Sequence, residues 1–299
     1  MFTPNSQATA PVVAFSAYAQ YVVVDIETGE APEQAIQAAI AAWKPSPTAK
    51  TAAEVIAEAE QAAAVWRVPT NLKDLAKMEA RQAAAMDKIN ADRQSALDKI
   101  ADKQRDAAER IRCKSALLDS APIICIGIQT QHGAVVFNGM DNIAYPINGV
   151  QCIACGSERD MLWTVRQWLE IYTSSETVLV GQNVRNFDLP KLRSAFTRWK
   201  LKLPTILAPR LASEQQNAVD ISSLFKGFSV EHRDDFCPSL DTICNALSIP
   251  RPKSVVSGAE VPGMHRNGRY QEILTYNAID ISATTRAYLL MSGQADDLT

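Results

Sequence analysis

The sequence predicts an α/β protein with a mixed β-sheet and a long helical insertion after the first strand. Short β-branched runs, bounded by turn signals, precede segments with helical periodicity. Residues 30–118 differ in composition from the rest of the chain: they are rich in Ala and charged residues and contain no Gly. The chain has 299 residues, of which 47% are hydrophobic and 21% charged, which suffices for one large core plus an appendage.

Four strands can be placed from the pattern. Residues 21–26 form a β-branched run that ends before the turn signal Thr28-Gly29, as expected of a buried strand. Residues 122–130 and 134–138 are expected to follow as strands joined by a hairpin-sized connection, and 177–182 as a fourth strand. Because strands come first and then alternate with helices, we expect a mixed sheet.

Helices are predicted where apolar residues recur at three- and four-residue steps or where a helix start is marked. The apolar face of Glu158–Tyr172 and the position of Pro190 in a first turn are the clearest of these signals. The predicted helices of this part of the chain are 158–172, 189–199, 238–247 and 270–291.

The insertion is dominated by one uninterrupted stretch. Residues 71–118 contain neither Pro nor Gly, which predicts a single helix of about 48 residues and about 70 Å, capped by Thr70 or Asn71. Its apolar seam is thin, and residues 73–114 carry eleven Lys or Arg against eight Asp or Glu. Two interpretations stay open: a solvated hairpin with a helix at 51–66, or an arm (71–115) for self-association or a partner protein.

Acidic residues stand in three places where a packed core should be apolar. Asp25 and Glu27 end the first strand and, two residues apart, point to one face of the sheet. Asp188 opens a helix after an apolar strand, and Tyr276 precedes Asp280 by one helical turn. Each has an ordinary explanation on its own: a solvated strand end, a helix N-cap and a surface pair.

Taken together and in this order, the three segments resemble the DEDD superfamily of 3′–5′ exonucleases. The spacing of Tyr276 and Asp280 is similar to that of the DEDDy branch. Further segments resemble predicted exonucleases related to the proofreading domain of family-B DNA polymerases, including phage-encoded members; they are 68–74, 219–221, 238–242, 249–250 and 268–273. The resemblance covers residues 21–291, with one departure at Gln182, where members often have His.

The resemblance implies a fold and a division of the chain. The fold would be ribonuclease H-like, with a mixed five-stranded sheet flanked by helices. Residues 1–29 and 119–299 would form the exonuclease domain, and 30–118 the helical insertion.

The resemblance also implies a mechanism. Asp25, Glu27, Asp188 and Asp280 would hold two Mg²⁺ or Mn²⁺ ions, the hard cations that oxygen ligands suit. Tyr276 would orient the attacking water, and nucleoside 5′-monophosphates would leave from a 3′ end. DNA with single-stranded 3′ ends is the expected substrate, and RNA is the alternative. A second hypothesis is a non-catalytic adaptor that binds nucleic acid or a protein through the helical arm.

Substrate contacts can be suggested from residue type. The backbone at Thr28 and Gly29 can approach the terminal nucleotide, and Asn183 and Phe187 can hold or wedge its bases. Residues 185–210 carry seven Lys or Arg and one Asp, which is either a solvated helix face or a phosphate track.

Composition excludes several other functions. A net charge of −3 argues against gripping nucleic acid by global charge, and no apolar run is long enough to span a membrane. We expect no secretory signal, and scattered cysteines favour a cytoplasmic protein, in the host cytoplasm if phage-encoded. Cys152 and Cys155 have zinc-knuckle spacing, but no second such pair exists.

Overall fold

The computed structural model describes residues 18–67, 74–140, 144, 146–147, 149–208, 218–235, 237–250 and 257–294. The chain divides into two compact units. The first, here the sheet unit, comprises 1–32 and 116–299; the second, the helical unit, comprises 33–115, inside the predicted insertion of 30–118. Among the described helices, none is both long and apolar enough to cross a membrane.

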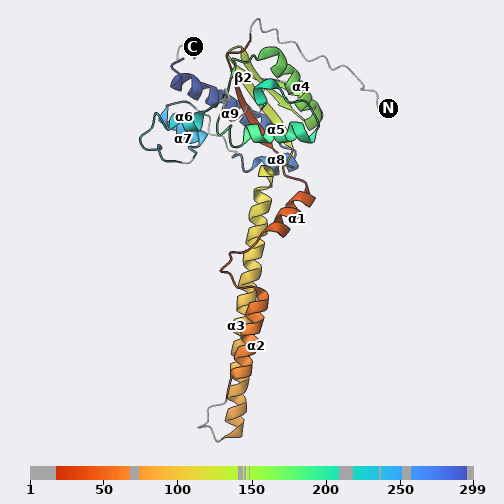
Figure 1. The fold of residues 1–299 in the computed structure, drawn as a ribbon, viewed down its shortest axis with the longest axis vertical. Helices are drawn as coiled ribbons and strands as arrows, with labels where there is room; N and C mark the ends of the chain where they lie inside the picture. Colours follow the sequence, from red (N-terminus) through yellow and green to blue (C-terminus); the bar gives the residue numbers. More distant parts are fainter. Residues whose placement is uncertain are drawn as a thin grey trace, which may run out of the picture. The chain divides into compact units, whose positions relative to one another are not determined.

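The sheet unit is built on a six-stranded mixed sheet with the order β4-β3-β2-β1-β5-β6 (Figure 1). Its central β1 pairs antiparallel with β2 and parallel with β5; β2–β3 is antiparallel, and β3–β4 and β5–β6 are parallel. The strands are β1 (Tyr21–Thr28), β2 (Ile123–Thr130), β3 (Gly133–Asn138), β4 (Gln151–Ala154), β5 (Val178–Gly181) and β6 (Ala218–Asp220).

The prediction of five strands was therefore wrong by one. The two strands that the pattern did not reveal, β4 and β6, have only four and three residues. Such short segments show no readable alternation, and they form strands because neighbouring β3 and β5 offer unpaired backbone groups.

Helices cover both faces of the sheet. On one face α9 packs with α6, α7 and α8 against alternate residues of β1, including Tyr21 and Val23. On the other face α4 and α5 pack against Val22, Val24 and Ile26. The helices of this unit are α4 (Glu158–Tyr172), α5 (Asp188–Arg198), α6 (Ile221–Phe225), α7 (Leu240–Ala246), α8 (Val261–Arg266) and α9 (Tyr270–Met291), with a 3₁₀ turn at Thr205–Leu207.

Local signals account for the longer helices. Both α4 and α9 have the predicted bounds. The Ser157 hydroxyl caps α4 by accepting the N–H of Asp160. Ser239 caps α7 in the same way, so that this helix begins two residues later than predicted.

The helical unit contains α1 (Glu33–Ala42), α2 (Ala52–Val65) and α3 (Leu75–Cys113). Thr51 and Glu54 form a reciprocal capping box at the start of α2, and α2 packs along α3 as a hairpin. The expectation of one helix over 71–118 was too long, since α3 has 39 residues. Its cap is Asp74, whose carboxylate accepts the N–H groups of Ala76 and Lys77; the expected caps Thr70 and Asn71 lie outside the described residues.

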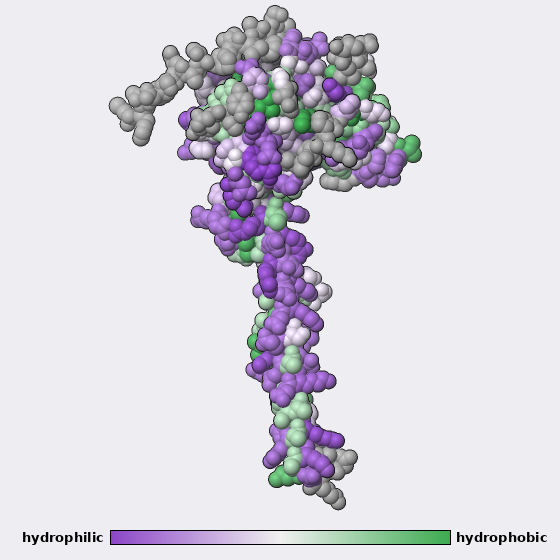
Figure 2. Space-filling view, turned by 180° about the vertical axis from the view of Figure 1, so that it is seen from behind, coloured by the Kyte–Doolittle hydropathy of each residue, from purple (hydrophilic) through white to green (hydrophobic). Residues whose placement is uncertain are grey.

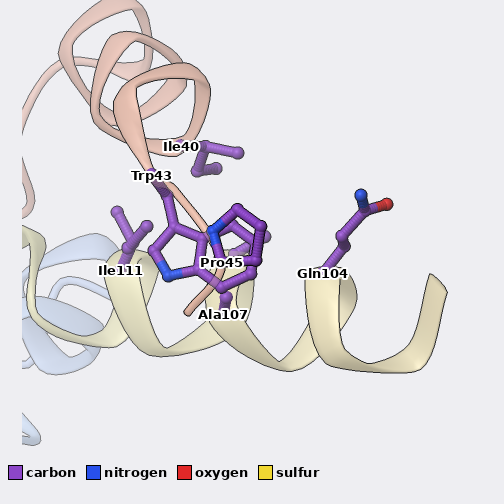
Figure 3. Close-up of a pocket in the computed structure, with 7 residues that line it drawn as sticks. Ile40, Trp43, Pro45, Gln104, Ala107 and Ile111 are labelled. Atoms are coloured by element: carbon purple, nitrogen blue, oxygen red, sulfur yellow. The ribbon is translucent and has the colours of Figure 1, made fainter. Parts of the chain in front are cut away.

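The face of the helical unit that Figure 2 shows is largely hydrophilic, with small apolar patches. An apolar pocket of about 270 Å³ lies between the α1 segment and α3. Figure 3 shows Trp43 and Pro45 over Ala107, with Ile40 and Ile111 beside them.

Candidate active site

Strand β1 carries Asp25 and Glu27 toward α9. Tyr21 and Val23, the preceding residues of the same alternation, belong to the core beneath α9. Glu27 is buried, with 7% of its surface exposed, and Asp25 is partly buried. The ordinary explanation of a solvated strand end therefore does not apply.

Asp188, the first residue of α5, lies at the same end of β1 as these two acids. Its Oδ1 accepts the N–H of Ile26 in β1 at 3.2 Å, and only 2% of its surface is exposed. The cap residue of α5 is Phe187, so Asp188 is not the N-cap that the pattern also allowed. Close approach of β5 to β1 depends on Gly181, where a Cβ would lie 2.9 Å from the Val24 carbonyl oxygen.

Helix α9 contributes Tyr276 and Asp280 from one face. Asp280 is buried, with 7% of its surface exposed, and the Tyr276 hydroxyl donates a hydrogen bond to its carboxylate. Burial and the charges of Asp280 and Glu27 raise the pKa of Tyr276 well above its ordinary 10.0. The phenol therefore holds its proton and acts as a hydrogen-bond donor.

The four acids lie close enough for their charges to affect one another. Burial, then the charges of Glu27, Asp188 and Asp280, raise the pKa of Asp25 well above 3.8. The pKa of Glu27 is raised by burial and then by Asp280 and Asp188. Burial is also the main reason that the pKa of Asp188 rises to about 7. The structure thus brings the four predicted acids and Tyr276 to one buried site at the carboxyl end of β1.

Three residues of this site were missed by reasoning from the sequence. Asn277, next to Tyr276, donates from Nδ2 to Asp25 Oδ2 at 2.7 Å. Gly127 lies opposite Asp25 in β2 and leaves room for α9. Asp220, at the end of β6, raises the pKa of Asp188 and accepts the N–H of Asn183 at 3.0 Å. The only available signal was that polar residues interrupt apolar segments at Asn277 and Asp220.

The donor chemistry of the site suits divalent cations. Among the described residues, no three His, Cys, Asp or Glu side chains are close enough to hold a metal ion as they stand. Buried carboxylates that raise one another's pKa values, however, are the oxygen ligands that Mg²⁺ or Mn²⁺ stabilises in the charged form. Asp25, Glu27, Asp188 and Asp280 would hold the ions.

The predicted substrate contacts are largely engaged within the protein. Thr28 and Gly29 are buried after a register shift in β1, and the Gly29 N–H donates to the Pro122 carbonyl at 2.9 Å. Asn183 adopts a left-handed φ of 56°, and its Oδ1 accepts from Asn186.

Phe187, the fourth predicted contact, is partly buried and packs against the core beneath α4 and α5. Asn183 is also partly exposed, so these two side chains keep some surface for a ligand. Gln182, the departure from the family pattern, donates from Nε2 to Ser222 Oγ and to the Pro238 carbonyl, both at 3.2 Å.

Four of the seven Lys and Arg residues of segment 185–210 hydrogen-bond to main-chain carbonyls of the sheet unit. Lys191 is buried and donates to the Leu118 carbonyl oxygen, and Arg193 donates to that of Leu207 at 2.7 Å. Arg185 and Arg198 likewise donate to backbone carbonyls, those of Ala218 and Asp119. Arg185 and Arg198 are nevertheless exposed, so the two expectations for this segment, a solvated helix face or a phosphate track, stay predictions.

The zinc-knuckle spacing does not produce a ligand pair. Cys152 belongs to the core beneath α9, whereas Cys155 packs against the core on the other face of the sheet. Burial raises the pKa of both thiols, that of Cys155 to about 11, so they are protonated at neutral pH.

Comparison with known proteins does not identify a family for this chain. The chemistry is therefore assigned from the convergence of these side chains. No protein-family model matches the sequence, and no curated protein matches it.

Proposed function

We propose that this protein is a metal-dependent 3′–5′ exonuclease with a ribonuclease H-like sheet unit. The observation that carries the proposal is the convergence of Asp25, Glu27, Asp188 and Asp280 with a protonated Tyr276. The six-stranded mixed sheet with helices on both faces is compatible with the fold implied by the DEDDy resemblance.

The four carboxylates explain why the site needs cations. Without cations their charged forms are disfavoured: burial first, and then the neighbouring acidic charges, raise the pKa values of Asp25, Glu27 and Asp188. Two divalent cations bound there would supply charge stabilisation for a phosphodiester and lower the pKa of the attacking water. The protein itself provides the negative charge and the dry surroundings that hold such ions.

Tyr276 is suited to orient a water molecule rather than to remove its proton. Its hydroxyl keeps its hydrogen because burial, and then the surrounding carboxylates, disfavour the phenolate. A Cβ at Gly258 would lie 3.7 Å from this hydroxyl, so the exposed segment 257–260 borders it. The 3′ end of the substrate would enter beside this segment, and nucleoside 5′-monophosphates would leave.

DNA with a single-stranded 3′ end is the proposed substrate, and RNA is the alternative. The phosphodiester chemistry is the same for both, so the four carboxylates do not distinguish DNA from RNA.

The helical unit favours an additional binding role. It forms a separate compact unit, and a pocket lined mostly by apolar side chains, among them Trp43 and Ala107, lies between the α1 segment and α3. This binding role is compatible with catalysis by the sheet unit.

The proposal is tested by release of nucleotides from 3′-labelled DNA and RNA, with Mg²⁺, with Mn²⁺ and with chelator. Asp25→Asn and Asp280→Asn should abolish release. Each substitution removes the negative charge of one proposed metal ligand and keeps the size of the side chain. Asp234→Asn, an exposed acid of the same unit, is the matched control and should cleave normally. Full activity of both site variants, or of the wild type in chelator, would contradict the proposal.

A further inference from the structure

Asn277 makes a direct connection between α9 and the acid cluster. It is completely buried, and its Nδ2 donates to Asp25 twice: to the side-chain Oδ2 at 2.7 Å and to the main-chain oxygen at 3.2 Å. These bonds connect α9 to β1 through two residues that are 252 positions apart in the sequence. Because both bonds end on Asp25, they restrain its carboxylate as well as its backbone.

The amide oxygen of Asn277, on the other side of the group, faces Gly127. In β2, Gly127 lies directly across from Asp25, and a Cβ there would be 2.3 Å from Asn277 Oδ1. Any side chain at position 127 would therefore displace the amide or the helix that carries it. Gly127 supplies only a hydrogen at this point, and α9 can approach the sheet.

The amide has only one chemically acceptable orientation. Among the described residues, Oδ1 of Asn277 is one of two buried side-chain polar atoms without a hydrogen-bond partner. Turning the amide over would place this acceptor against the main-chain oxygen of Asp25, which can only accept a hydrogen bond. The unpartnered oxygen is thus a consequence of giving the N–H to Asp25.

We infer that Asn277 is a positioning residue for the proposed reaction: its amide holds the Asp25 carboxylate in one orientation and ties Tyr276 and Asp280 to β1. The inference rests on the proposed function. Asn277 itself is too deeply buried to touch a substrate, so it acts through Asp25 and Glu27, whose carboxylates accept hydrogen bonds from its amide, and through the placement of α9. Groups that orient the ligands of a cation typically change affinity or activity 10- to 100-fold when they are removed.

The test removes the amide donor and measures cation binding separately from catalysis. Asn277→Leu keeps the approximate size without a donor, and Asn277→Ala, which adds no bulk, serves if the Leu variant does not fold. Thr285→Val is the matched control, because Thr285 is a buried polar residue of the same helix whose hydroxyl bonds only within α9, to the Ile281 carbonyl at 2.7 Å. Each protein is titrated with Mn²⁺ in a thermal-unfolding assay and assayed on 3′-labelled DNA.

We expect the Asn277 variants to need about tenfold more Mn²⁺ for half-maximal stabilisation and to lose about 10- to 100-fold in kcat, with KM for DNA unchanged. Thr285→Val should match the wild type in both measurements. A purely structural role would lower Tm but leave kcat and Mn²⁺ half-saturation at wild-type values, and that result would overturn the inference.

The two proposals fail in distinguishable ways. A wild-type protein that responds to Mn²⁺ but cleaves neither DNA nor RNA would refute the exonuclease, and the Mn²⁺ titration would still decide the role of Asn277. A wild-type protein with no Mn²⁺ response would overturn the positioning role together with the cation site.

Discussion

Replacing Asp188 with asparagine should stabilise the cation-free protein at alkaline pH. The substitution keeps the side-chain oxygen that accepts the N–H of Ile26 and removes a buried charge. The pKa of Asp188 rises from 3.8 to about 7 on folding, mainly through burial. At about 1.36 kcal/mol per pKa unit, this difference corresponds to up to about 4 kcal/mol of destabilisation once the carboxylate is charged.

The pH dependence follows from proton linkage. Between pH 4 and pH 7 the folded protein holds a proton on Asp188 that the unfolded chain has released, so the free energy of unfolding falls as pH rises. Above pH 7 the penalty is complete. Asp188→Asn should therefore exceed the wild type in stability by up to about 4 kcal/mol at pH 8 and equal it near pH 4.

Urea unfolding in chelator at pH 4, 6 and 8 measures this difference, with Asp234→Asn as an exposed control. Added Mn²⁺ should stabilise the wild type at pH 8 and stabilise Asp188→Asn much less, because one ligand charge is gone. The reasoning is wrong if Asp188→Asn is less stable than the wild type at pH 8 in chelator. It is equally wrong if the difference between the two proteins is the same at pH 4 and pH 8.

Two further predictions concern α9 and its contact with the sheet. Gly127→Ala should destabilise by about 1–3 kcal/mol in urea unfolding, since its Cβ would lie 2.7 Å from Ile281 Cγ2 as well as against Asn277. Gly263→Ala, with open space around it, is the control, and equal stability of the two variants would contradict the packing argument. Tyr276→Phe should lower kcat about 100-fold at unchanged KM, because the water-orienting hydroxyl is lost. Wild-type activity should show no loss from phenol ionisation below pH 10; a Phe variant with wild-type kcat would remove Tyr276 from the mechanism.

Local patterns revealed much of the architecture. The apolar face of α4 predicted the bounds of that helix, since helical periodicity over many residues leaves little ambiguity, and the bounds predicted for α9 also agree with the structure. The change in composition after β1 indicated a separate helical segment, which the structure shows as a compact unit over 33–115. Short elements such as β6 carried no such signal.

Charged residues were the hardest to interpret from sequence. Lys191 and Arg193 looked like surface cations, yet they donate to the backbone carbonyls of Leu118 and Leu207. Which carbonyls are left unpaired in loops depends on how distant segments pack, and local composition contains no record of this.

The amino-acid sequence by itself determined the residue types of the candidate site and the strand and helices that carry them, because strand and helix periodicity place Asp25 with Glu27 and Tyr276 with Asp280. Only the tertiary structure decided that these pairs meet Asp188 in a buried space, and that Asn277 bonds to Asp25 against Gly127. The reason is physical: desolvation and hydrogen bonding between β1 and α9 arise only when segments far apart in the chain pack together.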